Sequence, residues 1–185
     1  MNLIIRKPNK QDLKAIFNFC STYIDMSFEE FTKKAEKNSD LYFVVYDEGE
    51  LVGYCLGEAS EKDKSCVEID EIVTNVSTKR DYSRRGIGTK LIQKFEEEVW
   101  MRGFKTIGLG CSDNYEVEQF YLKNGYLPIE IVANSKDKEL ERIKITDYES
   151  GKIIQSELRS EYDLKEVNFI FEKYAMKKQC LRKMN

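Results

Sequence analysis

A short basic segment with two glycines is the part of the chain best suited to bind an anion. Residues 84–88 read Arg-Arg-Gly-Ile-Gly, and apolar residues recur at helical spacing directly after them. Glycines lack a Cβ, so the backbone can approach a ligand closely here. The following helix offers unpaired N–H groups and the positive end of its dipole, which favour a phosphate or pyrophosphate. A Gly-x-Gly sequence before a helix also occurs in simple tight turns, so the segment alone leaves both interpretations open.

Two other phosphate-binding patterns do not fit this segment. A dinucleotide-binding Gly-x-Gly-x-x-Gly fingerprint needs a third glycine where this chain has Leu91. The Gly-Lys-Ser/Thr sequence of nucleoside-triphosphate-binding loops does not occur anywhere in the chain. The sequence therefore gives no support to either class of nucleotide-binding protein.

The residue types also limit the chemistry that is available. The chain has no histidine, which excludes a Ser-His or Cys-His nucleophile pair and any His-ligated metal centre. A base would have to be a carboxylate, a tyrosine, a lysine or water. The five cysteines are scattered and no pair has Cys-x-x-Cys spacing, which predicts buried thiols, no disulfide framework and no metal site.

Composition places the chain among globular proteins. It has 185 residues, 41% of them hydrophobic and 34% charged, which suits one domain with a full core. The net charge of −3 argues against a general nucleic-acid binder. No apolar run is long enough for a membrane span or a secretory signal, so we expect a cytoplasmic protein.

The elements that must position the glycine segment follow from periodicity. Ser27 and Glu30 form a capping box for a second helix, a helix follows Gly88 as far as Gly103, and Asp113 or Asn114 can cap another helix. A hairpin turn over residues 47–50 joins two of the strands. Alternation and β-forming residues predict strands over 2–7, 41–46, 51–57, 65–77, 105–110, 127–133 and 168–174.

Residues 134–166 differ from the rest of the chain. Sixteen of these 33 residues are charged, and alternating runs over 142–148 and 152–158 flank Ser150 and Gly151. The pattern predicts an exposed, charged β-hairpin insertion before the last strand, which could serve as a dimer contact or a lid. We expect a single domain over 1–176 and a solvated basic tail over 177–185.

The element order and two motifs resemble the GNAT acyltransferase superfamily. Residues 83–88 resemble its Arg/Gln-x-x-Gly-x-Gly/Ala loop, with Ser83 in place of the first residue. Its Asn-x-x-Ala-x-x-Phe/Leu-Tyr-x-x-x-Gly-Phe helix is matched by Asn114, Val117, Phe120, Tyr121, Gly125 and Tyr126. The resemblance covers roughly residues 1–133 and 167–175. It implies an α/β fold with a mixed, mostly antiparallel central sheet flanked by helices.

The resemblance also implies a cosubstrate and residues that contact it. The cosubstrate is acetyl-coenzyme A (acetyl-CoA), and no metal is required. Asn114 is expected to touch the pantetheine arm, and Val76 and Ser77 are also expected to contact the cosubstrate. Backbone N–H groups near Asn75–Ser77 are expected to stabilise the oxyanion. The pyrophosphate contacts are expected from Arg84, Arg85, Gly86, Ile87, Gly88 and Thr89.

Two further residues are implied in catalysis. By resemblance, Tyr121 is the general acid that protonates the departing thiolate, whereas in isolation it reads as a core aromatic of an amphipathic helix. Glu71 is nearest to the family's usual base, with Glu68 and Asp70 as alternatives on the same strand. A strand bulge would change the face that Glu71 occupies, and an ion-paired surface role for it stays equally open.

The function implied is transfer of an acetyl group to a primary amine by direct attack on the thioester. The acceptor would be a small molecule or a peptide, in a site that Tyr23, Asp25, Phe28 and Glu29 could line. The main alternative is a catalytically silent acyl-CoA sensor or interaction module on the same fold. RNA docking through the charged hairpin and basic tail is a weaker idea, and a homodimer is possible.

Overall fold

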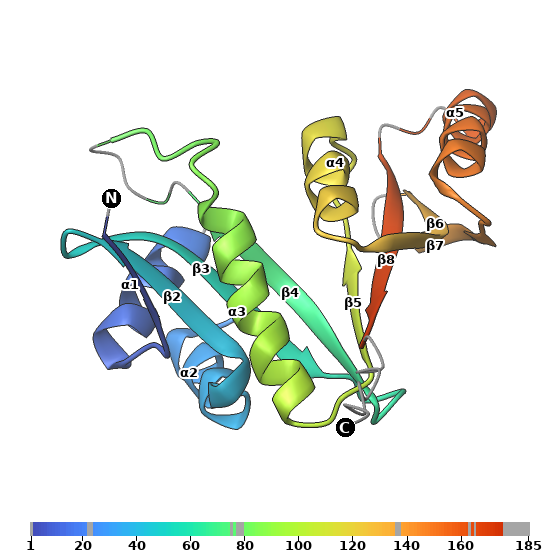
Figure 1. Ribbon diagram of the computed structural model, residues 1–185. Helices are drawn as coiled ribbons and strands as arrows, with labels where there is room; N and C mark the ends of the chain where they lie inside the picture. The colour runs from blue at the N-terminus through green and yellow to red at the C-terminus, as the bar shows by residue number, and fades with distance from the viewer. Residues whose placement is uncertain are drawn as a thin grey trace, which may run out of the picture.

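The fold is built on a mixed sheet with helices on both faces, as the computed structural model shows (Figure 1). The structure describes residues 2–21, 24–74, 76, 80–135, 138–162, 164 and 166–175. Within them, eight strands lie in the order β1-β2-β3-β4-β5-β8-β6-β7. The strands are β1 (Leu3–Arg6), β2 (Tyr42–Asp47), β3 (Glu50–Ala59), β4 (Cys66–Thr74), β5 (Thr106–Gly110), β6 (Leu127–Ser135), β7 (Lys138–Lys144) and β8 (Val167–Tyr174). The helices are α1 (Lys10–Cys20), α2 (Phe28–Lys37), α3 (Ile87–Met101), α4 (Tyr115–Lys123) and α5 (Tyr148–Tyr162), with a 3₁₀ turn over Ser39–Leu41.

Most neighbouring strands run antiparallel, and this mostly antiparallel sheet confirms the predicted fold class. β4 and β5 are the exception among the described strands, because helix α3 crosses over between them and they pair in parallel. Their pairing covers only Cys66–Ile69 against Thr106–Leu109. Beyond it the two strands part, as Figure 1 shows, and leave a gap that begins at Asp70 and Gly110.

Two apolar clusters define the two faces of the sheet. On one face, which we call the α3 face, side chains of α3, α4 and α5 pack against the sheet in one continuous core. On the other, the α1–α2 face, Ile16 and Phe31 pack on Val44 and Tyr54 of β2 and β3. Figure 1 shows α3 and the α1–α2 pair on opposite sides of the first four strands.

Local capping fixes where the helices begin. The Ser27 hydroxyl accepts from the Glu30 N–H at 3.2 Å and the Glu30 carboxylate accepts from the Ser27 N–H at 2.7 Å, which confirms the predicted capping box of α2. The hairpin turn between β2 and β3 is also confirmed, with Gly49 at a φ of +83°. Within the described residues, no helix is apolar and long enough to cross a membrane.

The predicted β-hairpin between residues 142–148 and 152–158 is wrong, because β7 covers only residues 142–144 of the first run and the second run is helical. β7 does pair with β6, but residues 148–162 form α5, and Ser150 and Gly151 lie in its first turn. Gly151, Gln155 and Leu158 are buried, and their spacing of four and three residues is that of a helix face. The helical pattern of burial is therefore the correct one, and the alternation of polar and apolar residues over 152–158 was misleading. The Ser150 N–H donates to the Asp147 carboxylate at 2.8 Å, so Asp147 acts as the helix cap.

We expect Gly57→Ala to lower the free energy of unfolding by about 1–3 kcal/mol, through overpacking. A Cβ at Gly57 would lie 2.6 Å from Cζ of Phe95 in α3 and 2.7 Å from the Glu68 carbonyl oxygen, which is backbone and cannot rotate away. Urea denaturation measures the loss. Gly108→Ala is a matched control, because that Cβ would meet only the Cys66 Sγ at an ordinary 3.7 Å. Equal loss in both variants would contradict the packing argument.

Candidate active site

A cavity of about 500 Å³ lies between the N-terminal ends of α3 and α4, beside the gap between β4 and β5. It brings together the glycine segment, residues 84–88, and α4, the helix that carries Tyr121 and that we call the tyrosine helix, although Gly88 and the first residue of α4 are 27 positions apart in the chain. Its lining is made by Ile72, Thr74, Tyr82, Ser83, Arg84, Arg85, Gly86, Ile87, Gly88, Thr89, Glu116, Val117, Phe120 and Tyr121. We call it the α3–α4 cavity.

Gly86 gives this cavity its anion-binding geometry. It is the N-cap of α3 at a φ of +74°, a left-handed conformation that glycine adopts without strain, and no side chain caps the helix. A Cβ there would meet no protein atom within 4 Å. The first N–H groups of α3 therefore have no side-chain cap, and a phosphate suits such a helix end.

The arginines beside Gly86 have partners that hold them near the cavity. Arg84 Nη2 donates to Glu116 Oε1 of α4 at 2.6 Å, so an exposed ion pair joins the two helix ends. The Arg85 guanidinium lies 5.6 Å from the centre of the Tyr82 ring. Ser83 stands where the family motif has Arg or Gln. Its N–H donates to the Asp81 carboxylate at 2.8 Å, and this bond holds the backbone of the loop at that position.

Tyr121 enters the same cavity from α4. It is 5% exposed, and its ring packs 5.2 Å from that of Phe120 and 5.8 Å from that of Phe171. In the part of the chain that the structure describes, its hydroxyl has no hydrogen-bond partner. Burial raises the pKa of Tyr121 above its usual value, so the phenol stays protonated at neutral pH and can act as a donor.

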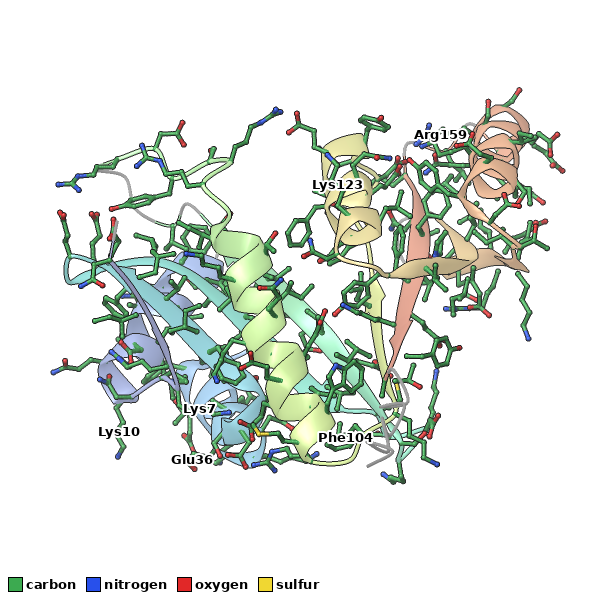
Figure 2. The ribbon with its side chains drawn as sticks, in the orientation of Figure 1. Lys7, Lys10, Glu36, Phe104, Lys123 and Arg159 are labelled. Atoms are coloured by element: carbon green, nitrogen blue, oxygen red, sulfur yellow. The ribbon has the colours of Figure 1, made fainter. Side chains whose placement is uncertain are left out.

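Asp113 and Asn114 were both predicted as possible caps of α4, and the hydrogen bonds at the start of this helix distinguish them. Asn114 Oδ1 accepts from the N–H groups of Glu116 at 2.9 Å and Val117 at 3.2 Å, so Asn114 is the cap. Asp113 instead accepts from the Val167 N–H at 2.9 Å and pairs with Arg159 of α5. Figure 2 labels Arg159, on the side of α5 nearer to α4. These bonds tie the start of the tyrosine helix to both α5 and β8.

A bulge in β4 sets the direction of two carboxylates. Leu56 pairs with Glu71 and Gly57 with Ile69, so Asp70 is an extra residue on β4. In a regular strand, Ile69 and Ile72 would point to opposite faces of the sheet. Here both contact the core of the α3 face, as the extra residue requires. Asp70 and Glu71 consequently both face the α1–α2 side, at the start of the gap.

These carboxylates line a second cavity, of about 270 Å³, on the α1–α2 face. Lys34 Nζ lies 2.9 Å from Asp70 Oδ2 and 3.5 Å from Glu58 Oε1. Burial raises the pKa of Asp70, and the hydrogen bond from Lys34 only partly offsets it. The remaining walls of this α1–α2 cavity come from Cys20, Ile24, Met26, Phe31, Tyr42 and Leu56.

The arrangement can therefore bring two reactants together through the sheet. The α3–α4 cavity suits a ligand with a pyrophosphate, and the α1–α2 cavity offers carboxylates to a cation or an acid–base step. Both cavities reach the same stretch of β4, where Glu71 lines one and Ile72 the other. A group that enters the gap from one face can thus meet a group that enters from the other.

Comparison with known proteins identifies the family. The family model described as "Acetyltransferase (GNAT) family" matches residues 10–126, which is more than half of the chain. The chain belongs to this family. The match spans α1 through α4, and so includes both predicted motifs.

Two solved structures share this fold at low identity. The ribosomal-protein-S18-alanine N-acetyltransferase of Escherichia coli is 17% identical, with a TM-score of 0.65, and the match covers 97% of this chain and 99% of that chain. The PaiA N-acetyltransferase of Thermoplasma acidophilum, solved in complex with coenzyme A, is 16% identical with a TM-score of 0.59, over 95% of this chain and 100% of that chain.

A sequence relative matches over a shorter stretch. The tRNA(Met) cytidine acetyltransferase TmcA of Thermofilum pendens is 33% identical over 57 residues. These residues make up 31% of this chain and 7% of that enzyme. The likeness is therefore to a small part of a much longer protein.

Not every predicted site residue of this GNAT protein lies in a cavity wall. The loop residues Arg84–Thr89 and Tyr121 line the α3–α4 cavity, and Glu71 lines the α1–α2 cavity. Asn114 caps α4 without lining either, so its contact with a ligand stays a prediction. The Val76 N–H donates to the Val52 carbonyl at 3.3 Å, and Ser77 lies outside the described residues. An oxyanion contact from Val76 would need that bond to break, and it too stays a prediction.

The four residues predicted to line an acceptor site do not line the α1–α2 cavity where the structure describes them. Tyr23 lies outside the described residues. Phe28 packs its ring 5.2 Å from that of Phe17, Glu29 pairs with Lys33 at 2.8 Å, and Asp25 is absent from the cavity wall. The predicted region between α1 and α2 does contribute, through neighbouring side chains that the sequence did not single out. Met26 and Phe31 gave no sequence signal beyond their apolar character.

Proposed function

We propose that this GNAT protein transfers the acetyl group of acetyl-CoA to a primary amine. The observation that carries the proposal is that two cavities on opposite faces of the sheet are lined by adjacent residues of β4, Ile72 on one face and Glu71 on the other, next to the point where β4 stops pairing with β5. One has an uncapped helix N-terminus and Tyr121, and the other has Asp70 and Glu71. Acetyl-CoA would bind from the α3 face and the amine from the α1–α2 face.

The reaction would proceed by direct attack of the amine nitrogen on the thioester carbonyl carbon. The new C–N bond forms, the C–S bond breaks, and the sulfur leaves as a thiolate. The Tyr121 hydroxyl would donate a hydrogen bond to that thiolate. The amine nitrogen would release its surplus proton to Glu71 or Asp70, directly or through water. A protonated Tyr121 on one face of the sheet and the carboxyl groups of Asp70 and Glu71 on the other suit these two roles.

The backbone amides of α3 would hold the pyrophosphate of acetyl-CoA, with Arg84 and Arg85 adding positive charge. A ligand oxygen at this helix end would meet N–H groups that have no side-chain cap. The coenzyme A complex of the PaiA N-acetyltransferase supports the choice of cosubstrate, because the two proteins share a fold.

Thermal unfolding with acetyl-CoA, coenzyme A, ATP and NAD in parallel tests the cosubstrate. A ligand at about 100 times its dissociation constant stabilises the folded state by about 2.7 kcal/mol, so we expect a raised midpoint with the two coenzyme A species alone. Free thiol release with an amine panel, including cytidine because of the TmcA match, then tests transfer. Binding without turnover on every amine would favour the silent acyl-CoA sensor instead.

We expect Glu116→Gln to tighten acetyl-CoA binding about two- to fivefold. The Glu116 carboxylate competes with a phosphate for Arg84 and adds negative charge at the cavity mouth, and an exposed pair of this kind is worth up to about 1 kcal/mol. Calorimetry measures the change. Glu97→Gln is the control, since that carboxylate pairs with Lys94 and does not line the cavity. Weaker binding in Glu116→Gln would show that the ion pair assembles the site.

A further inference from the structure

A row of polar residues on α5, which we call the α5 stripe, faces the start of the tyrosine helix. Its members stand four, three and four residues apart, which is the spacing of one helix face, and each is at least partly buried. They are Tyr148, Lys152, Gln155 and Arg159. The match to the family model ends at residue 126, so α5 lies outside it. The family match therefore does not account for the stripe.

The first half of the α5 stripe satisfies a buried carboxylate of α4. Glu118 is 1% exposed, and a glutamate is rarely so buried unless it has partners. The Tyr148 hydroxyl donates to Glu118 Oε2, and Lys152 Nζ donates to the same oxygen at 3.2 Å. Both donors belong to α5, so the burial of this charge on α4 depends on α5.

The second half of the stripe holds the residue just before the cap of α4. Asp113 accepts from Gln155 Nε2 at 3.3 Å and pairs with Arg159. Gln155 is buried and also donates to the Val167 carbonyl at 2.6 Å, which connects α5 to β8. The tyrosine helix is thus held by α5 at two points, one just before its first residue and one at Glu118.

These polar contacts restrict the rotation of α4 about its axis. Glu118 and Tyr121 are three residues apart, so they lie on the same side of the helix in successive turns. The Tyr121 ring packs against that of Phe171, but apolar attraction has no preferred direction, whereas a hydrogen bond does. A rotation of α4 that moved the Tyr121 hydroxyl would also pull the Glu118 carboxylate from its donors on α5. It would leave a buried charge unpaired, which is strongly unfavourable.

We propose that α5 braces the tyrosine helix and thereby sets the position of the Tyr121 hydroxyl in the α3–α4 cavity. This inference rests on the proposed function, in which that hydroxyl donates to the departing thiolate. The brace consists of the contacts that the α5 stripe makes with Glu118 and Asp113. Both are positioning residues, because they contact α5 and are not part of the wall of the α3–α4 cavity.

The double variant Glu118→Leu/Tyr148→Phe tests the brace. It removes the carboxylate together with the hydroxyl that binds it, and replacing both partners of a buried polar contact by apolar groups usually preserves folding. We expect the single-turnover rate of acetyl transfer to fall about tenfold, because a displacement below about 1 Å is enough for such a loss. The dissociation constant of acetyl-CoA, measured by calorimetry, should stay the same.

A second carboxylate–phenol pair on the same helix gives the matched control. The Tyr162 hydroxyl of α5 donates to Glu141 Oε1 at 2.6 Å, and this pair joins α5 to β7 instead of α4. Glu141→Leu/Tyr162→Phe therefore makes the same chemical changes without touching the brace. We expect it to transfer acetyl groups at the wild-type rate, and a loss equal to that of Glu118→Leu/Tyr148→Phe would overturn the inference.

Two comparisons separate positioning from a purely structural role. In a Tyr121→Phe background, Glu118→Leu/Tyr148→Phe should lower the rate no further, because the hydroxyl that the brace positions is already absent. Glu118→Gln keeps an oxygen that can accept from Tyr148, so it should stay within about threefold of the wild-type rate. An equal fall in rate with and without the Tyr121 hydroxyl would overturn the inference. So would a wild-type rate in Glu118→Leu/Tyr148→Phe.

Fluorine NMR of protein labelled with fluorotyrosine makes the test independent of turnover. The resonance of Tyr121 is identified by its absence from Tyr121→Phe. We expect it to shift or broaden in Glu118→Leu/Tyr148→Phe and to stay in place in the control. If that double variant does not fold, Arg159→Leu loosens the same brace through Asp113, at a side chain that is 38% exposed, and should move the resonance as well. An unchanged resonance in the folded variant would overturn the inference.

Failure of the brace and failure of the proposed function give different results. A wild type that releases no thiol with any amine would refute the transferase, and a Tyr121 resonance that moves only when the brace is removed would still support the brace. Thiol release by the wild type, with the rate and the resonance both unchanged in Glu118→Leu/Tyr148→Phe, would support the transferase and refute the brace.

Discussion

Tyr121→Phe is expected to lower kcat by about 100-fold while leaving acetyl-CoA affinity unchanged. Only the hydroxyl is lost, and the ring contacts with Phe120 and Phe171 are those a phenylalanine can make. The hydroxyl has no hydrogen-bond partner within the described residues, so its removal leaves no buried group unsatisfied. The loss should therefore appear in the chemical step, when the thiolate leaves, and not in stability.

Tyr126→Phe provides a matched control for this change. Tyr126 is another buried tyrosine, its ring centre is 5.7 Å from that of Tyr121, and it does not line the α3–α4 cavity. Its variant loses a buried hydroxyl in the same core and should keep kcat. Single-turnover kinetics with acetyl-CoA prebound isolate the chemical step. Equal rates for wild type and Tyr121→Phe would remove Tyr121 from the mechanism and reassign it to the core.

The local parts of the candidate site could be read from the sequence. The glycine segment and the tyrosine helix each fit within one short stretch, where residue spacing directly determines which groups lie together. Gly86 before α3 and Asn114 before α4 are caps whose types alone indicate a helix start. The buried state predicted for the cysteines is confirmed for Cys20, Cys55, Cys66 and Cys111, and Cys180 lies outside the described residues.

The bulge in β4 lay beyond what residue spacing can determine. Residues 65–77 read as one strand, and nothing in the side-chain types marks Asp70 as the extra residue. The bulge is a shift in the pairing of β4 with β3, and it falls where the pairing of β4 with β5 ends, so it appears only once the strands are paired. The bulge nevertheless places Glu71 on the same face as Asp70. The Glu71 carboxylate therefore lines the α1–α2 cavity.

The error over α5 has a similar origin. Residues 152–158 contain polar and apolar residues that fit an alternating pattern as well as a helical one over so short a run. Packing selects the helix, since Gln155 donates to the Val167 carbonyl at 2.6 Å and Leu158 is buried against the core of the α3 face. The α1–α2 cavity could not be predicted from local spacing either, because Lys34 of α2 meets Asp70 of β4 only in the folded protein.

Gly86→Val is expected to weaken acetyl-CoA binding about 100-fold or more. The valine side chain would project into the α3–α4 cavity, where no protein atom lies within 4 Å of the new Cβ, so it would occupy space that the pyrophosphate needs. Loss of two charge-assisted hydrogen bonds to backbone N–H groups, at roughly 1.5–3 kcal/mol each, accounts for a loss of this size.

Backbone strain must be separated from this steric effect, because a valine at a φ of +74° is itself unfavourable. Gly49→Val carries the same strain at a φ of +83° in the β2–β3 turn, where a Cβ also meets no atom within 4 Å. Both variants should melt at similarly lowered temperatures, and only Gly86→Val should lose acetyl-CoA in calorimetry. If both variants bind acetyl-CoA equally well, the pyrophosphate does not lie at the start of α3, and the basic segment before that helix serves only as a turn.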